Sequence, residues 1–399
     1  MSAAAVQDRI HSLDVMRGFA VLGILAVNAA LFAAPWQASA NPNLAPLDVN
    51  AQTLWSWLVM HVLFEFKCIT LFSLLFGASL YLVGGERGDA ERGRVLHRRL
   101  FWLLVFGLIH ATLIWYGDIL VTYALTGFLV MQARSWPAYR LMIGGVALYA
   151  LTLGLMHLAW LVPAGELAGM KSAIWAPAPA EVERVQAAYQ GGLVSALREN
   201  FSTWTLFITS SLAVLVARTA GVMMIGMALF KMGFLSGKAP VWVYGFALAL
   251  GAGALGLIGW QAWLNARADF EFAHMQVRGT LANTALSIFV SIAYASLFVL
   301  LVKAGARLIT APLAAIGRMA FTNYIAQSLI MTTIFWGGRG FGLFGELDRP
   351  ALWAIVWTIW AVQLIWSPLW LSRFQMGPLE WVWRRLSYAR PVAMVKEFR

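Results

Sequence analysis

Long apolar stretches alternate with short polar segments along almost the whole chain. A helix that crosses a bilayer needs about 20 apolar residues, because each residue rises about 1.5 Å through a hydrocarbon core of about 30 Å. Ten stretches reach or approach this length, and they predict an all-α, polytopic membrane bundle of about ten transmembrane helices. They are residues 15–34, 61–82, 100–116, 118–132, 139–163, 201–235, 240–262, 281–303, 312–336 and 351–372.

The basic residues indicate which side of the membrane each loop faces. With ten crossings, 20 of the 29 Lys and Arg residues lie on the side of the N-terminus, and seven lie on the opposite side. Cytoplasmic loops carry such an excess, so we expect both termini in the cytoplasm. Two short crossings within 201–235 would move Lys231 and the later basic clusters to the other side. This stretch therefore predicts one long helix followed by an interfacial turn.

Two of the extracytoplasmic segments are long. Residues 35–58 include an amphipathic stretch around Trp55 and Trp57, and residues 164–200 include a charged helical segment. Either segment can cover a pocket or simply connect two helices. The chain is accordingly expected to comprise an N-terminal five-helix region, an extracytoplasmic loop, and a C-terminal five-helix region with a cytoplasmic tail, over residues 1–163, 164–200 and 201–399.

The beginning of the chain allows a second interpretation. Ala38-Ser39-Ala40 matches the small-x-small pattern of a signal-peptide cleavage site. Asn28 within the preceding apolar stretch, and the acidic Asp14 close to Arg17, favour an uncleaved first helix instead.

Composition narrows the class of protein further. Hydrophobic residues make up 61% of the chain and charged residues only 12%, against roughly 25% charged in soluble domains. This excludes a soluble enzyme, a fibre or a disordered regulator. The net charge of +11 comes mostly from loops between spans, where it sets topology, so we expect no nucleic-acid partner. A single cysteine, Cys68, forms no internal disulfide, and the sequence shows no metal-ligand spacing, phosphate loop or nucleophile elbow.

The candidate functional residues are the few polar side chains inside the apolar stretches. A charge at the centre of a bilayer costs about 2.5–3.5 kcal/mol, so such residues are retained mainly for function. Here they are Asp14, Arg17, Asn28, Glu65, Lys67, His110, Asp118, His157 and Arg218.

On the first helix, Asp14, Arg17 and Asn28 share one face at about 100° per residue. The stripe rises about 21 Å from the cytoplasmic entrance to Asn28. The Asp14–Arg17 pair alone can serve merely as a headgroup anchor. The amide on the same face favours a helix that lines a polar cavity.

On the second helix, His61 and Glu65 are four residues apart and face the same way. A continuous helix turns Lys67 about 200° away from Glu65. Lys67 is then expected either to find an anion, a carbonyl or water within the protein, or to extend to the outer surface.

The third pair of candidates is His110 and Asp118. Asp118 opens the fourth helix, where an acid caps the helix N-terminus. Topology places Asn28, Glu65, Lys67, His110 and Asp118 in the outer half of the membrane, which predicts a shared site. A histidine oriented by a carboxylate suits general-base catalysis of acyl transfer, and the same residues suit a proton-coupled transporter. Arg218 requires an acidic or phosphate partner or a cytoplasmic vestibule, whereas His157 is expected to make a packing hydrogen bond.

Several short motifs resemble the bacterial YeiB-like membrane proteins. In the N-terminal half these are Leu13-Asp14-Val15-Met16-Arg17-Gly18, Lys67 with Leu71-Phe72-Ser73, and His110 with Gly117-Asp118-Ile119-Leu120. In the C-terminal half, the following segments resemble that family's domain of unknown function 418: Gly226-Met227-Ala228-Leu229, Gly317-Arg318-Met319-Ala320, and Gly377-Pro378-Leu379-Glu380-Trp381. The matches extend from about residue 12 to 388.

The resemblance implies a function only broadly. YeiB-like proteins are similar to a wider transmembrane acyltransferase superfamily that includes the lysosomal heparan glucosaminide acetyltransferase, and they have also been labelled possible transporters. Superfamily members transfer an acyl group from cytosolic acyl-CoA to a sugar across the membrane. Two histidines compete for the catalytic role. His61 follows the first loop, as in the lysosomal enzyme, whereas His110 matches the YeiB-like motif better.

We therefore expect an inner-membrane acyltransferase that uses acyl-CoA as donor and no metal. His110 is expected to act as base, Asp118 to orient it, and Lys67 and Asn28 to stabilise the oxyanion, while the cytoplasmic donor entrance comprises Asp14, Arg17 and Arg318. The expected partners are membrane lipids and an extracytoplasmic small-molecule or glycan acceptor. A secondary transporter of a small solute and a non-catalytic scaffold stay open as alternatives. No pattern in the sequence predicts the oligomeric state.

Overall fold

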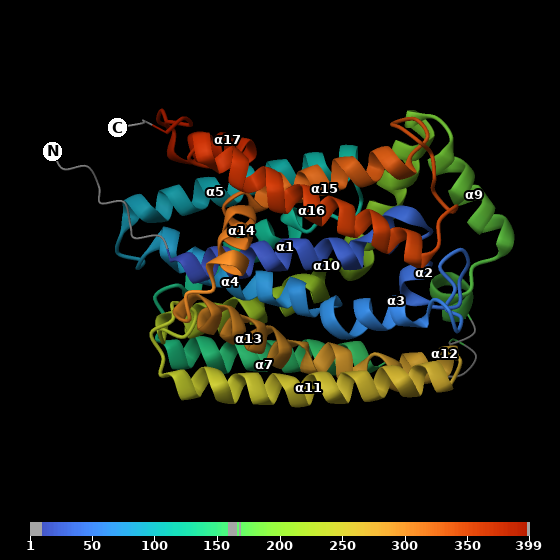
Figure 1. Ribbon diagram of the computed structural model, residues 1–399, viewed down its shortest axis with the longest axis horizontal. Helices are drawn as coiled ribbons and strands as arrows, with labels where there is room; N and C mark the ends of the chain where they lie inside the picture. Colours follow the sequence, from blue (N-terminus) through green and yellow to red (C-terminus); the bar gives the residue numbers. More distant parts are fainter. Residues whose placement is uncertain (1–9, 159–165, 167–168, 397–399) are drawn as a thin grey trace.

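The computed structural model describes residues 10–158, 166 and 169–396 of the 399. Over these residues the chain is helical and its long helices run roughly parallel to one another (Figure 1). Eight segments within the described ranges are long and apolar enough to cross a membrane. They are α1 (His11–Ala33), α3 to α4 (Leu54–Gly84), α5 with η2 (Ala90–Ile114), α7 (Ala138–His157), α10 (Leu193–Lys231), α11 (Val241–Arg267), α13 (Leu281–Lys303) and α16 (Arg349–Arg373).

Eight of the ten expected spans are thus confirmed by length and composition, and the other two are shorter. Residues 159–163 of the expected span 139–163 lie outside the described residues. Residues 118–132 form α6 (Leu120–Val130) and η3 (Met131–Ala133). Residues 312–336 divide at Met319 between α14 (Arg307–Arg318) and α15 (Ala320–Phe335). The count of ten crossings stays a prediction. The expected single helix over 201–235 is confirmed, since α10 continues through 39 residues and a turn follows it.

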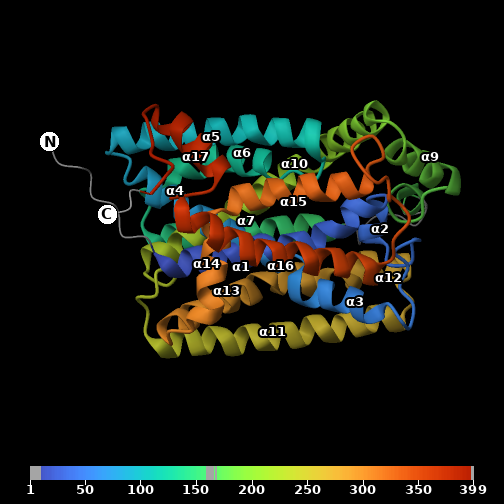
Figure 2. The same cartoon turned by 45° about the horizontal axis from the view of Figure 1, so that its top comes forward.

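Close packing of glycines places α1 at the centre of the bundle, between α4, α13, α14, α15 and α16. A Cβ on Gly18 would lie 1.9 Å from the carbonyl oxygen of Leu313, and one on Gly317 would lie 1.8 Å from that of Asp14. Small residues let the backbones of α1 and α14 approach this closely. Helices from both predicted five-helix regions therefore pack together, with α5 and α11 at opposite edges (Figure 2).

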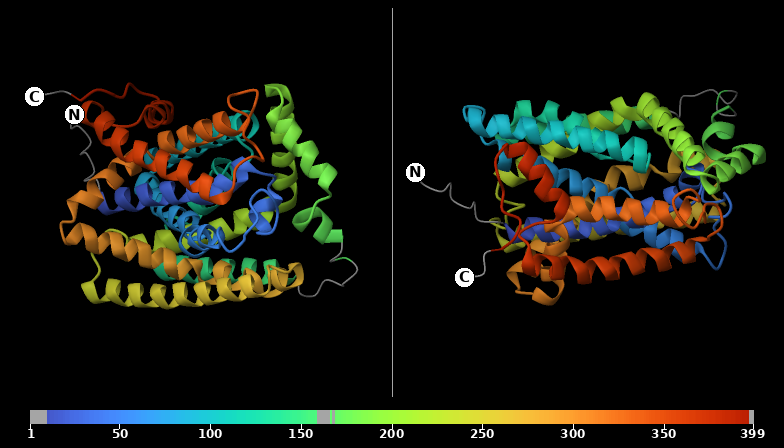
Figure 3. Two further views of the ribbon diagram at one scale, coloured as in Figure 1. Left: turned by 45° about the vertical axis from the view of Figure 1, so that its right-hand side comes forward. Right: turned by 90° about the horizontal axis from the view of Figure 1, so that it is seen from above.

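The two ends of the bundle differ. One end, here termed the capped end, carries α2 (Gln37–Ala40), η5 (Lys171–Trp175), α9 (Pro179–Gln190), α12 (Phe272–His274) and η6 (Met275–Gly279). Figure 3 shows α9 lying across this end, where α1 finishes. The other end, here termed the α17 end, carries α17 (Pro378–Tyr388) and the beginning of α1. The segments predicted to be extracytoplasmic thus gather at the capped end.

Buried polar contacts hold the short helix α15 in place. The side chain of Gln327 donates to that of Gln363 at 2.9 Å, and Gln363 donates to the backbone oxygen of Asn323 at 3.1 Å. At the N-terminus of α15, the Glu380 carboxylate accepts hydrogen bonds from the backbone N–H groups of Phe321 and Thr322, at 2.7 and 3.1 Å. A carboxylate is a favourable cap for a helix N-terminus. Glu380 of the C-terminal motif therefore serves to position α15.

Candidate functional site

The second span is broken where its polar residues lie. It runs as α3 (Leu54–Val59), a π-helical turn η1 (Met60–Phe64), and α4 (Lys67–Gly84). Between them Phe66 adopts a left-handed backbone conformation, with φ of 64°. A non-glycine residue there costs of order 1–3 kcal/mol, and π-helical turns and such strain cluster at functional sites. The expectation of one continuous helix over 61–82 is therefore wrong.

This break brings Lys67 back toward the residues that precede it. The Lys67 ammonium group donates to the backbone oxygen of His61 at 2.7 Å and to the side-chain oxygen of Asn283 on α13. Lys67 is fully buried. Of the two expected outcomes, the structure shows the one in which Lys67 finds internal partners rather than the outer surface.

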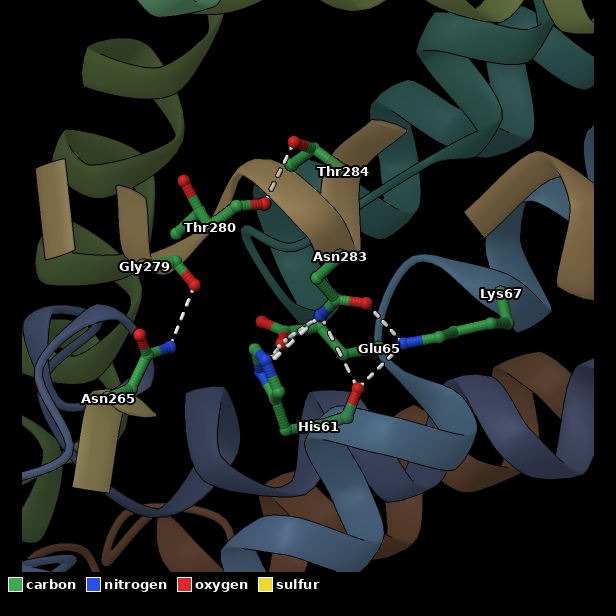
Figure 4. Close-up of polar contacts among 8 residues, drawn as sticks. All are labelled: His61, Glu65, Lys67, Asn265, Gly279, Thr280, Asn283 and Thr284. Atoms are coloured by element: carbon green, nitrogen blue, oxygen red, sulfur yellow. Dashed lines mark hydrogen bonds and ion pairs between the residues drawn. The ribbon is translucent and has the colours of Figure 1, made fainter. Parts of the chain in front are cut away.

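His61 and Glu65 form a tightly bonded pair (Figure 4). The distance from His61 Nδ1 to a carboxylate oxygen of Glu65 is 2.5 Å, and the Asn283 amide donates to the same oxygen at 3.0 Å. The ring of Trp57 stacks on the imidazole, with centroids 4.5 Å apart. His61 Nε2 is buried and has no hydrogen-bond partner among the described residues. A neutral imidazole with its proton on Nδ1 would hold a free lone pair on Nε2.

A cavity of about 550 Å³ lies beside this pair. His61 and Glu65 form part of its wall, together with Asn28 of α1. Both long segments predicted to be extracytoplasmic contribute to the wall as well, through Ser39, Ala40, Pro42, Trp57, Ile174 and Trp175. Of the two alternatives left open for these segments, covering a pocket or merely connecting helices, the structure shows the first. The volume of the cavity lies in the usual range for small-molecule sites, which are mostly apolar with a few well-placed polar groups.

His110 and Asp118 form a second pair, as the sequence suggested. His110 Nδ1 lies 2.8 Å from an oxygen of Asp118, and His110 Nε2 lies 2.9 Å from the hydroxyl of Ser328 on α15. The other oxygen of Asp118 accepts the backbone N–H of Val121 at 2.7 Å, so its expected role as a cap of α6 is confirmed. Both nitrogens of His110 are therefore engaged.

The four residues expected to form one catalytic centre occupy three places. Asn28 lines the cavity. Lys67 bonds to Asn283, while His110 and Asp118 bond to each other and to Ser328. Tyr324 links the His110 pair to the cavity beside His61. Its ring lies 5.1 Å from that of His110, and it also lines the cavity. The catalytic roles of the four residues stay predictions.

The residues expected at the donor entrance lie at the α17 end. Arg17 pairs with Asp14 at 3.1 Å and reaches the hydroxyl of Ser79 at 3.5 Å. Arg318 donates to the backbone oxygen of Gln375 at 2.8 Å. Because Gly317 packs on the carbonyl of Asp14, all three lie near the beginning of α1. Their role in binding a donor stays a prediction.

Two other intramembrane candidates have different surroundings. His157 Nδ1 bonds to the backbone oxygen of Leu153 at 2.7 Å, which confirms a packing hydrogen bond. The Arg218 guanidinium lies over the rings of Phe66 and Tyr149, at 4.9 and 5.7 Å from their centroids. No described carboxylate pairs with it.

Sequence reasoning missed Asn283 and Tyr324. Asn283 bonds to His61, Glu65 and Lys67 from a helix more than 200 residues later in the chain. The available signal was a lone amide near the start of the apolar stretch 281–303. Tyr324 lies within the expected span 312–336 and was not a candidate, although its buried hydroxyl has no partner among the described residues.

Comparison with known proteins agrees with the sequence motifs. Residues 229–390 match the family model described as "Protein of unknown function (DUF418)". Over 400 residues the chain is 33% identical to "Uncharacterized protein YeiB" of Escherichia coli strain K12, covering 95% of this chain and 96% of that protein. It is also 29% identical to "Uncharacterized protein YxaH" of Bacillus subtilis strain 168, covering 97% and 96%. A protein of Bacillus acidopullulyticus, described as "Uncharacterized 39.9 kDa protein in amylase 3'region", is 28% identical over its nearly complete length, with 100% of this chain and 99% of that protein aligned.

Proposed function

The chain belongs to the YeiB-like family of bacterial membrane proteins, and from this premise we propose that it is an inner-membrane acyltransferase. It moves an acyl group from cytosolic acyl-CoA to a hydroxyl or amine at the extracytoplasmic side. One observation carries the proposal: His61 lines a cavity at the capped end, with Nδ1 bound to Glu65 and Nε2 without a partner in the described part of the chain. A histidine held in this way is suited to general-base catalysis.

The chemistry follows from the two nitrogens of His61. Nε2 takes the proton of the acceptor hydroxyl or amine as that atom attacks the acyl carbonyl. The tetrahedral intermediate then expels the CoA thiolate, which takes the proton back from Nε2, and the acceptor keeps the acyl group. Glu65 orients the imidazole and stabilises its cationic form in between. The Asn28 amide on the cavity wall supplies a hydrogen bond to the oxyanion.

Donor and acceptor enter from opposite ends in this proposal. Arg17 and Arg318 at the α17 end fit phosphate groups, since guanidinium groups bind phosphate through paired hydrogen bonds. Asp14, bound to Arg17, reduces the positive charge there. From Arg17 to Ile24, which lines the cavity, α1 rises about 10 Å at 1.5 Å per residue. A pantetheine arm is long enough to cover that rise.

A second function, proton-coupled transport of a small solute, is favoured by the break in the second span. Transporter sites are typically formed by discontinuous membrane helices. Here the break at Phe66 lies among His61, Glu65 and Lys67, which are groups able to carry protons.

The test uses purified protein reconstituted into lipid vesicles with radiolabelled acetyl-CoA outside and bacterial membrane extract as the source of acceptor. We expect free CoA thiol to be released and label to enter the acceptor fraction, and His61→Gln to abolish both. Absence of transfer and of any stabilisation of the protein by acetyl-CoA would contradict the acyltransferase. Uptake of solute driven by a proton gradient, without transfer, would support the transporter.

A further inference from the structure

Arg218 carries a positive charge in the middle of α10, inside the membrane, without an acidic partner in the part of the chain that the structure describes. Its guanidinium lies against the rings of Phe66 and Tyr149. One of its terminal nitrogens, Nη2, is buried and lacks any hydrogen-bond partner among the described residues. Intramembrane charges are costly and are normally paired, so an unpaired one indicates a binding function. The contacts with the two rings fit cation–π interactions, and they leave the N–H groups of Nη2 available for a ligand.

Arg218 lies next to the cavity of His61. Phe66, which it contacts, is part of the cavity wall. Leu215 also lines the cavity, and it precedes Arg218 by three residues on the same face of α10. An anion bound to the free edge of Arg218 would therefore lie at the border of the space that contains His61, Glu65 and Asn28.

The same border opens toward the bilayer. Leu215 lines the cavity and yet is 44% exposed. Leu206, which lies nine residues earlier on α10, is 48% exposed. Within a membrane such exposed leucines contact lipid. The cavity wall is mostly apolar, with a few polar side chains from the described residues, chiefly Asn28, His61, Glu65, Gln276, Thr280 and Tyr324. An occupant that reaches this space past Leu215 has an apolar chain in the bilayer and a polar head group inside.

We propose that Arg218 binds the phosphate of a phospholipid whose head group carries a hydroxyl, and that this head group is the acceptor presented to His61. A guanidinium binds phosphate through charge-assisted hydrogen bonds, and one phosphate supplies the counter-charge that the described residues do not. The acceptor role rests on the proposed function, whereas the binding of the phospholipid does not. The ligand class is therefore a lipid phosphate that enters sideways from the bilayer.

The test measures thermal stabilisation of purified protein in a neutral detergent. The probes are dioleoylphosphatidylglycerol, dioleoylglycerol, which lacks the phosphate, and glycerol 3-phosphate, which lacks the chains. We expect phosphatidylglycerol alone to raise the melting temperature. Arg218→Gln removes a hydrogen bond to a charged group, so we expect it to need about 10- to 100-fold more lipid for the same shift. Arg218→Lys, which keeps the charge but loses the planar edge, is expected to lie between the two.

The matched control is Arg198→Gln, which removes the same charge from an exposed position on α10. It is expected to respond like the wild type. An unchanged lipid response in Arg218→Gln, or an equal loss in Arg198→Gln, would overturn the proposed site. Equal stabilisation by glycerol 3-phosphate would also overturn it, since the ligand would then be a free phosphate ester.

Failure here is distinguishable from failure of the proposed function. His61→Gln is expected to keep the full response to phosphatidylglycerol while losing acyl transfer. Acyl transfer that depends on His61 but is unaffected by Arg218→Gln would leave the acyltransferase in place and refute the phospholipid acceptor.

Discussion

Two histidine–carboxylate pairs are built on the same local plan in this molecule, but their surroundings differ. His61 and His110 both lie in π-helical turns, η1 within the second span and η2 at the end of the third, and each has Nδ1 bonded to a carboxylate. The second nitrogen of His110 bonds to Ser328, whereas that of His61 has no partner among the described residues. The His61 pair also lines a cavity, and its counterpart is packed in the interior.

The two pairs differ in whether a ring nitrogen lacks a hydrogen-bond partner, and this difference indicates which histidine is available for catalysis. Buried polar groups in folded proteins are almost always hydrogen-bonded, so a saturated pair such as His110–Asp118 is explained by structure alone. Structure alone does not explain a ring nitrogen that lacks a partner beside a cavity, because the missing hydrogen bond costs about 1–3 kcal/mol. The first expectation, with His110 as the base, reverses in favour of His61 in the function proposed here.

Replacing each histidine in turn gives the largest expected difference between the two pairs. His61→Ala removes the free Nε2, so we expect the turnover number for acyl transfer to fall by about 10²–10⁴. His110→Ala is expected to leave the turnover number near that of the wild type. The initial rate of CoA thiol release measures both. An equal loss in His110→Ala, in protein whose melting temperature is unchanged, would return the base role to His110.

The free energy of unfolding should show the reverse order, with a larger loss for His110→Ala than for His61→Ala. His110→Ala leaves the buried carboxylate of Asp118 without its partner, and breaking one side of a buried charged pair costs about 3–5 kcal/mol. His61→Ala leaves Glu65 with the Asn283 amide and a cavity beside it, so its cost should be smaller. Chemical denaturation of the two variants in the same detergent gives the comparison. A larger loss for His61→Ala would show that the His61 pair is the structural one.

The distant helices that complete each pair offer a finer test. Asn283→Leu removes the amide that joins Glu65 and Lys67, and Ser328→Ala removes the hydroxyl on His110 Nε2. We expect Asn283→Leu to lower the turnover number about tenfold, because an oriented base loses its support. Ser328→Ala should cost about 1 kcal/mol of stability and little rate. If the two substitutions lower the rate equally, the distinction between the pairs does not hold.

The sequence predicted most of the helices and both pairs, but not the difference between them. Apolar stretches marked the spans, and helical spacing placed His61 and Glu65 on one face. The left-handed conformation of Phe66 was not predictable, because a phenylalanine in an apolar stretch carries no turn signal and a continuous helix is its local preference. Asn283 and Ser328 belong to helices that reach the two histidines only through tertiary packing, at sequence separations of 222 and 218 residues. Which nitrogen stays free depends on those contacts and thus on the whole fold.

The smallest expected effect concerns pH and the helix that carries Ser328. Burial raises the pKa of Glu380 above its ordinary value of 4.5, and hydrogen bonds from Thr322 and Phe321 offset this only in part. Since its pKa is raised in the folded state, the contribution of Glu380 to stability is present below pH 4.5 and is lost as pH rises through the raised pKa. The melting temperature of the wild type, relative to Glu380→Gln, should therefore fall by a few degrees as pH increases across this window.

Ionisation of Glu380 should affect the His110 pair more than the His61 pair. The reason is that Glu380 caps α15, which carries Ser328 and Tyr324. Ionisation of the buried Glu380 side chain costs free energy, and this cost falls on the N-terminal turn of α15 that Glu380 contacts. No contact described for Glu380 involves His61 or Glu65. The protection factors for hydrogen exchange in α15, which are corrected for the intrinsic rise of exchange with pH, should accordingly fall as pH rises in the wild type. Those in η1 should not change. A pH response confined to η1, or one that persists unchanged in Glu380→Gln, would mean that the two pairs are not supported independently, and the comparison between them would lose its physical basis.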